Sequence, residues 1–201
     1  MSQELPETIL DEKVIPVARG LDASSAPVVG RALLDGGFST IEVTVEGAGG
    51  VAAIESLHGL GMTVGAGTVL TVDQAVSAVA AGAVFLVTPH IDQVLVEWGV
   101  ATGVPMIPGG LTPTEISAAL ELGPAAVKVF PASLGGPDYL KSLLAPYPGA
   151  SLIPTGGIDG GNAAAYLAAG AVAIGVGGWL TAHEEVATIT ERARELSSKV
   201  V

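Results

Sequence analysis

Short apolar runs rich in β-branched residues recur along the whole chain and alternate with amphipathic stretches. Eight such runs begin at Val14, Thr40, Met62, Ala83, Val104, Ala125, Ser151 and Ala171. Successive starts are 20 to 26 residues apart, which is the length of a strand, a loop and a helix of about 10–12 residues. The runs are continuously apolar, as in strands that are covered on both faces. The pattern therefore predicts eight consecutive βα units.

The stretches between these runs carry helix signals. Residues that can cap a helix start precede four predicted helices: Asp22 before Ala23–Asp35, Thr71 before Val72–Ala80, Thr112-Pro113 before Thr114–Leu122, and Asp159 before Gly160–Ala169. Glycine, which adopts the left-handed conformation at a helix C-terminus at little cost, stands where several of these helices should end: Gly36-Gly37, Gly82, Gly123 and Gly170. We therefore expect each strand to be followed by a helix.

Eight βα units favour closure into a (β/α)8 barrel, the TIM-barrel form of the α/β class. An open doubly wound sheet is the alternative, and it would normally carry a glycine-rich turn after its first strand and an acidic residue about 20 positions later. The first turn here, residues 19–22, lacks that fingerprint. Ser2–Lys13 is predicted to form an extra N-terminal helix that closes the bottom of the barrel. We expect a single domain over residues 1–201.

Composition limits the possible partners and location. With 201 residues, 49% of them apolar, the chain can build one large core. Its net charge is −12, with eight Lys and Arg in total, so we expect no binding to nucleic acid or to an anionic membrane surface. No apolar run reaches the roughly 18 residues of a membrane span. The first six residues do not resemble a secretory signal, which favours the cytoplasm.

The residue types also restrict the chemistry. The chain has no cysteine, which excludes thiolate nucleophiles and cysteine-ligated metals. Its three histidines are scattered and form no metal-ligand pattern, so we expect neither a metal nor another cofactor. An acidic protein must hold an anionic substrate with local devices such as backbone N–H groups and helix N-termini. Glycine-rich turns are therefore candidate binding sites.

Lys128 stands in the middle of a predicted strand, in Val127-Lys128-Val129. Side chains at the C-terminal ends of barrel strands carry the chemistry of such folds, and a buried ammonium group is costly unless something compensates it. One interpretation is a buried ion pair with Glu42. The interpretation that we favour is a desolvated amine that attacks a carbonyl group and forms a Schiff base.

Three further polar residues lie within or directly after predicted strands. Glu42 and Thr44 face the barrel interior if strand alternation places them inward. Glu42 can then act as a general acid/base, directly or through one water, and can pair with Lys128 as well. Thr68, which follows Gly65-Ala66-Gly67, offers a hydroxyl and backbone donors to a carboxylate. The alternative for Thr68 is an ordinary cap of the helix that follows.

Two glycine pairs follow the last two predicted strands. Gly156-Gly157 comes after strand seven and Gly177-Gly178 after strand eight. In barrels these two loops commonly form a phosphate site from backbone N–H groups. Glycine also suits tight turns, which would explain either pair alone but less readily both. Trp179 and Phe130 are interpreted as packing residues rather than as platforms for a cofactor, and Phe130 is expected to line the pocket next to Lys128 as well.

Four motifs in order resemble those of a known family. They are Ile41-Glu42-Val43-Thr44, residues 65–70 (GAGTVL), residues 127–132 (VKVFPA) and Pro154-Thr155-Gly156-Gly157, within a stretch from Val14 to about Leu180. This stretch resembles the class I 2-keto-3-deoxy-6-phosphogluconate (KDPG) aldolases and their 4-hydroxy-2-oxoglutarate (KHG) and phosphogalactonate relatives. The resemblance implies a trimeric barrel that, without metal, cleaves the phosphorylated keto-deoxy sugar acid to pyruvate and glyceraldehyde 3-phosphate in the Entner–Doudoroff route.

The resemblance also assigns roles to individual residues. Lys128 would form the imine and Glu42 would be the proton shuttle. Thr68 would hold the pyruvate carboxylate, Pro89 and Phe130 would line the site, and Thr155 would contact the sugar hydroxyls. Gly156, Gly157 and Gly177 would contribute phosphate contacts.

The chain departs from the family pattern at two positions. Many relatives have Arg four residues after the strand-two glutamate, where this chain has Glu46, so the carboxylate is expected to be held by Arg19 and Thr68 together. Relatives often have Ser where this chain has Gly178, which removes one side-chain contact to the phosphate.

The choice among substrates stays open. Residues 131–140 and the turn 88–91 look more like the galactonate branch, whereas Thr155 before the glycine pair looks like the gluconate type. Two more distant functions are also weighed. One is an isomerase or epimerase with Glu42 as its base, and the other is a non-catalytic phosphosugar-binding barrel.

Overall fold

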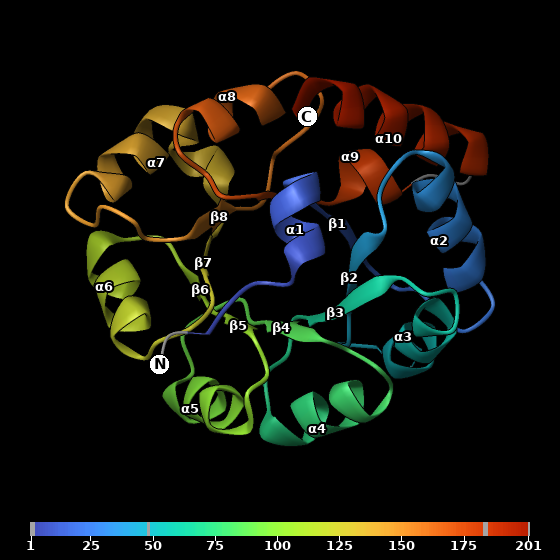
Figure 1. The fold of residues 1–201 in the computed structure, drawn as a ribbon, viewed down its shortest axis with the longest axis horizontal. Helices are drawn as coiled ribbons and strands as arrows, with labels where there is room; N and C mark the ends of the chain where they lie inside the picture. Colours follow the sequence, from blue (N-terminus) through green and yellow to red (C-terminus); the bar gives the residue numbers. More distant parts are fainter. Residues whose placement is uncertain (1–2, 48, 183–184, 201) are drawn as a thin grey trace.

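In the computed structural model, which describes residues 3–47, 49–182 and 185–200, helices surround a set of parallel strands (Figure 1). The strands are β1 Val14–Ala18, β2 Thr40–Thr44, β3 Thr63–Gly67, β4 Phe85–Val87, β5 Met106–Ile107, β6 Gly109–Gly110, β7 Val127–Val129, β8 Leu152–Pro154 and β9 Ile174–Val176. The α-helices are α1 Glu7–Glu12, α2 Ala26–Asp35, α3 Gly50–His58, α4 Val72–Ala80, α5 Gln93–Thr102, α6 Pro113–Glu121, α7 Gly136–Leu144, α8 Ala163–Ala168, α9 Gly178–Thr181 and α10 Val186–Val200. Each of the eight apolar runs contains a strand, as predicted.

The strands form two parallel sheets. One has the order β5-β4-β3-β2-β1-β9 and the other the order β6-β7-β8. In the larger sheet, Glu42 of β2 lies opposite Val17 of β1 and Gly65 of β3. The architecture is therefore an α/β fold in which a curved parallel sheet is enclosed by helices.

Two predicted helices begin later than the sequence suggested, because their capping residues form turns instead. The carboxylate of Asp22 accepts hydrogen bonds from the amides of Ser24 and Ser25 and from both hydroxyls, so α2 begins at Ala26. The hydrogen bond from the Ser25 amide is the main cause that holds the pKa of Asp22 well below its usual range. Asp159 likewise accepts from the amides of residues 161 and 162, and α8 begins at Ala163.

The other two predicted caps are confirmed. The hydroxyl of Thr71 accepts a hydrogen bond from the Gln74 amide at the start of α4. Thr112 and Glu115 form a reciprocal capping box at the start of α6. Local sequence signals therefore place these two helix starts correctly.

The N-terminal helix is shorter than predicted. Of the predicted segment Ser2–Lys13, the structure shows a helix over Glu7–Glu12. Residues 3–6 are not helical, Lys13 is the left-handed C-cap, and Ser2 lies outside the described residues. Gln3 instead binds the backbone of Gly99, Val104 and Met106 through its side-chain amide, so this segment is held by side-chain contacts rather than by helix formation.

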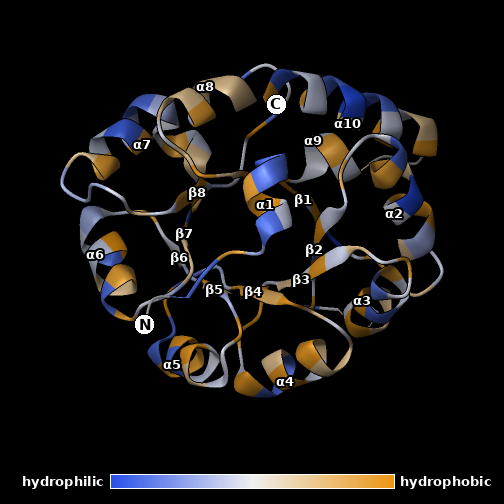
Figure 2. Ribbon diagram, in the orientation of Figure 1, coloured by the Kyte–Doolittle hydropathy of each residue, from blue (hydrophilic) through white to orange (hydrophobic). Residues whose placement is uncertain are grey.

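Strand alternation separates two apolar cores. Residues such as Ile41, Val43 and Val45 pack in the larger core with helix residues, where the inner faces of the helices are hydrophobic (Figure 2). A smaller core inside the curved sheet combines Ile9 of α1 with residues that lie in strands or directly before them: Ile15, Phe85, Val87, Ile107, Ala126, Ile153 and Ala173. Because neighbours in a strand point to opposite faces, Glu42 and Lys128 belong to the inner face.

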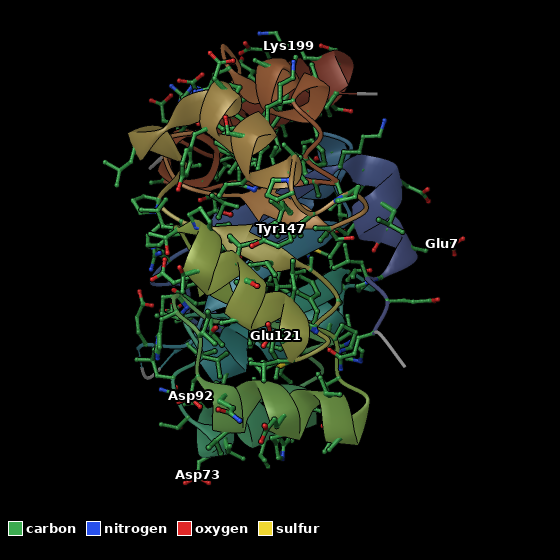
Figure 3. The ribbon with its side chains drawn as sticks, turned by 90° about the vertical axis from the view of Figure 1, so that its left-hand side faces the viewer. Glu7, Asp73, Asp92, Glu121, Tyr147 and Lys199 are labelled. Carbon is green, nitrogen blue, oxygen red and sulfur yellow. The ribbon has the colours of Figure 1, made fainter. Side chains whose placement is uncertain are left out.

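The two ends of the strands lie on opposite faces of the molecule. Glu7 of α1 projects from one face and Asp92, the N-cap of α5, lies toward the other (Figure 3). The carboxyl ends of the strands lie on the second face, away from α1. Within the described residues, no helix is both long and apolar enough to cross a bilayer.

Candidate active site

Lys128 and Glu42 meet in the interior, although their strands belong to different sheets. The Nζ atom of Lys128 lies 3.8 Å from Oε1 of Glu42, and the two side chains are 4% and 3% exposed. Glu42 Oε1 has no hydrogen-bond partner among the described residues. The ion pair considered from the sequence is therefore present, but it is longer than a hydrogen bond. An amine and a carboxylate this close can act on one substrate carbonyl.

Glycines in β3 make room for this pair. A Cβ atom added to Gly67 would lie 2.1 Å from Glu42 Oε1, and one added to Gly65 would lie 2.1 Å from the ring of Phe85. A side chain at either position would displace a buried group. The Gly-Ala-Gly sequence of β3 is thus explained by the space that Glu42 and Phe85 occupy.

The aromatic ring of Phe130 lies close to the amine of Lys128. Lys128 Nζ is 5.2 Å from the ring centroid, a distance at which the ring face attracts a cation. The Phe130 ring also contacts the backbone position of Gly156, where an added Cβ would come within 3.3 Å. Phe130 therefore lies between the buried amine and the glycine pair.

Thr68 has a strained backbone. Its φ angle is 55°, a left-handed conformation that is unusual for a β-branched residue and costs about 1–3 kcal/mol. The alternative in which Thr68 caps the following helix is wrong, because Thr71 is the N-cap of α4. Such strain is often found at functional sites. The predicted role of Thr68 in substrate binding stays a prediction.

Arg19 connects Thr68 to Glu46 at the mouth of the site. Its Nη1 atom is 3.0 Å and 3.4 Å from the two carboxylate oxygens of Glu46 and 3.5 Å from the Thr68 hydroxyl. The two side chains of the ion pair are 56% and 44% exposed. Glu46, which stands four residues after Glu42 in the sequence, thus binds Arg19.

A cavity of about 330 Å³ opens at the carboxyl ends of β1, β7, β8 and β9. Among the predicted site residues, it is lined by Arg19, Phe130, Thr155, Gly156, Gly157, Gly177 and Gly178. Lys128, Glu42, Thr68 and Pro89 do not line it. The structure therefore brings both glycine pairs together, as predicted, and places the amine behind Phe130 rather than in the cavity wall.

Backbone conformation accounts for one glycine pair. Gly156 and Gly157 have φ angles of 96° and 76°, and a Cβ on Gly157 would lie 2.6 Å from that of Ser133. The tight-turn explanation is thus correct for this pair.

The backbone does not require glycine at Gly177 and Gly178 in the same way. Their φ angles are not left-handed, and an added Cβ would meet no atom closer than 3.8 Å. Their open backbone leaves room for a ligand.

Four residues of the cavity wall were not predicted as site residues: Val17, Ile158, Asp159 and Trp179. Trp179 was interpreted as a packing residue; it does pack, because the Arg192 guanidinium lies 5.0 Å from its ring centroid, but it also lines the cavity. Their positions directly after the glycine pairs, or on the inner face of β1, were the signals that could have identified them.

Pro89 lies away from this cavity. Its carbonyl oxygen is close to Gly109, where an added Cβ would come within 2.5 Å, and the neighbouring Thr88 hydroxyl donates to the His90 carbonyl. The turn 88–90 is therefore packed against the start of β6. The predicted contact of Pro89 with substrate stays a prediction.

Comparison with known proteins identifies the family. A family model described as "Aldolase: KDPG and KHG aldolase" matches residues 6–192. The chain belongs to the KDPG and KHG aldolase family. Its 2-dehydro-3-deoxy-phosphogluconate aldolase relative from Treponema pallidum is 40% identical over 178 residues, which are 87% of this chain and 85% of that protein.

Two other relatives extend the comparison. The 2-dehydro-3-deoxy-6-phosphogalactonate aldolase of Escherichia coli is 33% identical over 168 residues, 82% of each chain. The crystal structure of a KDPG aldolase from Legionella pneumophila, with pyruvate captured at low pH as a covalent carbinolamine intermediate, is 31% identical. Its TM-score is 0.87, and the match covers 94% of this chain and 96% of that one. The aldolase fold and the sequence family therefore agree.

Proposed function

We propose that this chain is a class I aldolase that cleaves 2-keto-3-deoxy-6-phosphogluconate to pyruvate and glyceraldehyde 3-phosphate through a Schiff base. The observation that carries the proposal is Lys128, a buried amine 3.8 Å from the Glu42 carboxylate. Membership of the KDPG and KHG aldolase family supports the reaction class. The carbinolamine in the Legionella relative supports covalent catalysis by an amine.

The reaction follows from the positions of these two groups. The lone pair of Lys128 Nζ adds to C2 of the substrate. The C2 oxygen then leaves as water, after it gains one proton from the nitrogen and one from solvent, and a protonated imine remains. Glu42 takes the proton of the C4 hydroxyl, the electrons of the C3–C4 bond move into the imine, and the aldehyde leaves an enamine behind. Glu42 then returns the proton to C3. Hydrolysis of the imine releases pyruvate and frees the amine.

The remaining site residues bind the substrate. Arg19 and Thr68 hold its carboxylate, and their 3.5 Å contact supports a shared role. Pro89 and Phe130 line the reacting end, and Thr155 contacts the sugar hydroxyls. The backbone N–H groups of four glycines bind the phosphate: Gly156, Gly157, Gly177 and Gly178. The shared cavity of the two glycine pairs supports this last assignment.

The phosphogalactonate epimer and 4-hydroxy-2-oxoglutarate are the alternative substrates. The first is favoured by the 33% identity to the phosphogalactonate aldolase of E. coli. Turnover of all three compounds, compared by kcat/KM, decides among them. The highest value for the gluconate compound is expected, and a higher value for either alternative would reassign the substrate.

We further infer a closed (β/α)8 barrel that forms one domain over residues 1–201. Two contacts support closure of the sheets. Thr155, directly after β8, forms a parallel bridge with Gly175 of β9, and only Pro108 separates β5 from β6. Ile9 supports a role of α1 as the cover of the barrel bottom, because it packs in the inner core. Action without a metal, a homotrimer and a cytoplasmic location remain the predictions of the sequence.

Borohydride trapping tests the Schiff base. The protein is treated with pyruvate and borohydride, and a covalent adduct of reduced pyruvate is expected on Lys128 by peptide mass spectrometry. Lys141→Met, which removes an exposed lysine of α7, should leave the adduct intact. No adduct, or an adduct on Lys13, Lys141 or Lys199 instead, would overturn the imine and favour an isomerase or a binding protein.

A second experiment tests the predicted independence from metal. Turnover is measured with and without EDTA, and the same rate is expected in both.

A further inference from the structure

Thr44 is a buried polar residue that the proposed reaction does not use. It is 2% exposed, and its hydroxyl has no hydrogen-bond partner among the described residues. A buried hydroxyl without a hydrogen-bond partner destabilises the folded protein, so such a group calls for an explanation. A valine at this position would fill the same volume without that cost.

The position of Thr44 on β2 directs its side chain to the reaction centre. Ile41, Val43 and Val45 pack in the outer core with the helices, so by alternation Glu42 and Thr44 share the inner face. On β3, Thr44 lies opposite Gly67. Gly67 has no side chain that could form a hydrogen bond with the Thr44 hydroxyl. Thr44 is also nearer than Glu42 to the carboxyl ends of the strands, from which a substrate enters.

Glu42 Oε1 and Thr44 Oγ1 are two unpartnered buried oxygens on one strand face. Side chains at positions i and i+2 of a strand are about 6.6 Å apart. One oxygen atom that makes hydrogen bonds of about 2.8 Å to both groups bridges most of that distance. Such an oxygen would lie beside the Lys128 amine, which is 3.8 Å from Glu42 Oε1.

We propose that Thr44 is a positioning residue that, together with Glu42, holds the oxygen through which protons pass between Glu42 and the substrate. The proposal rests on the proposed aldolase function. In the pyruvate half-reaction this oxygen belongs to a water. The water takes a proton from C3 of the imine and passes one of its own to Glu42, while the C–H electrons form the enamine double bond. The reverse transfer returns a solvent proton to C3.

Thr40 provides a matched control within the same strand. It is also fully buried, and its hydroxyl is also unpartnered among the described residues. Thr40 lies two residues before Glu42, toward the inner apolar core rather than toward the mouth. Thr40→Val therefore removes a hydroxyl that is as buried as that of Thr44. Its position lies on the other side of Glu42, away from the strand ends at which the substrate is expected to bind.

Exchange of the pyruvate methyl protons in D2O, followed by NMR, tests the proposal. Thr44→Val is expected to slow exchange about ten-fold, the effect of one lost hydrogen bond. Borohydride trapping on Lys128 and the affinity for pyruvate should stay unchanged. Thr44→Ser, which keeps the hydroxyl, and Thr40→Val should both exchange at nearly the wild-type rate. Loss of packing alone would not slow proton exchange while leaving borohydride trapping and pyruvate affinity unchanged.

Other results would overturn this role. Wild-type exchange in Thr44→Val would exclude it, and equal slowing in Thr44→Val and Thr40→Val would indicate a general packing effect. If Thr44→Val does not fold, Thr44→Ala compared with Thr44→Ser gives the same contrast, with equal rates counting against the proposal. Failure of the wild-type protein to show trapping would overturn the proposed function, whereas trapping with a Thr44-independent exchange rate would overturn this inference alone.

Discussion

The ion pairs Lys128–Glu42 and Arg19–Glu46 differ in both burial and geometry. Lys128 and Glu42 are almost completely buried, yet their closest atoms are 3.8 Å apart and Glu42 Oε1 makes no hydrogen bond among the described residues. Arg19 and Glu46 are half exposed, yet one guanidinium nitrogen reaches both carboxylate oxygens, the closer at 3.0 Å. The pair with hydrogen-bonding geometry is thus the exposed one, where solvent screening leaves an ion pair with little effect on stability.

The difference indicates what each pair is for. A buried ion pair stabilises a fold only if its hydrogen bonds compensate the loss of hydration, and the interior pair lacks them. The two groups are instead close without a hydrogen bond between them, as the proposed roles of amine nucleophile and proton acceptor require. The exposed pair gains little stability, but it determines which group Arg19 binds before a substrate arrives.

Lys128→Met should have the largest effect. Loss of the amine removes the covalent route, so kcat should fall on the order of 10⁴-fold or more, and trapping of pyruvate should cease. Steady-state assays and mass spectrometry measure both. A stability measurement tests whether the pair also holds the fold. The double variant Lys128→Met/Glu42→Met, which replaces both charged groups with apolar side chains of similar volume, should be as stable as the wild type or more stable by up to about 4 kcal/mol. A clearly less stable double variant would mean that the pair holds the fold.

Glu42→Gln should have the next largest effect. The amide cannot accept the transferred proton, so kcat should fall by about 10²–10⁴-fold, whereas borohydride should still trap pyruvate on Lys128. Pre-steady-state trapping and steady-state turnover distinguish these steps. Unchanged turnover would assign the proton transfer to another group.

Gly67→Ala tests whether the placement of the Glu42 carboxylate matters. The added Cβ would lie 2.1 Å from Oε1, so the carboxylate must move, and displacement by about 1 Å can cost up to about 10²-fold in rate. Gly47→Ala is the control, because an added Cβ there meets no atom within 4 Å. Equal kcat values for the two variants would show that the reaction tolerates a displaced carboxylate.

Glu46→Gln should have the smallest effect. It releases Arg19 from an exposed partner, so KM for the anionic substrate should fall by about two- to five-fold at low salt, and the gain should shrink as salt rises. The free energy of unfolding should change by less than about 0.5 kcal/mol. Titration of KM against ionic strength measures the first effect and chemical denaturation the second. A higher KM would mean that Glu46 orients Arg19 for binding.

Local signals in the sequence predicted much of the scaffold. The eight apolar runs locate the strands because burial on both faces requires continuous hydrophobicity. Thr71 and Thr112 cap their helices as predicted because a cap needs only residues within one turn. Asp22 and Asp159 were misjudged, because an aspartate binds a turn of its own as readily as a helix N-terminus.

The sequence by itself determined the strand and helix order, the placement of one lysine and one glutamate within buried strands, and the glycines that end the last two units. Only the tertiary structure decided that Lys128 and Glu42 meet at 3.8 Å, that Arg19 binds Glu46, and that Trp179 and Asp159 share a cavity with the glycine pairs. The reason is physical: periodicity and caps depend on neighbours along the chain, whereas distances between side chains of different strands depend on how the sheets curve and pack.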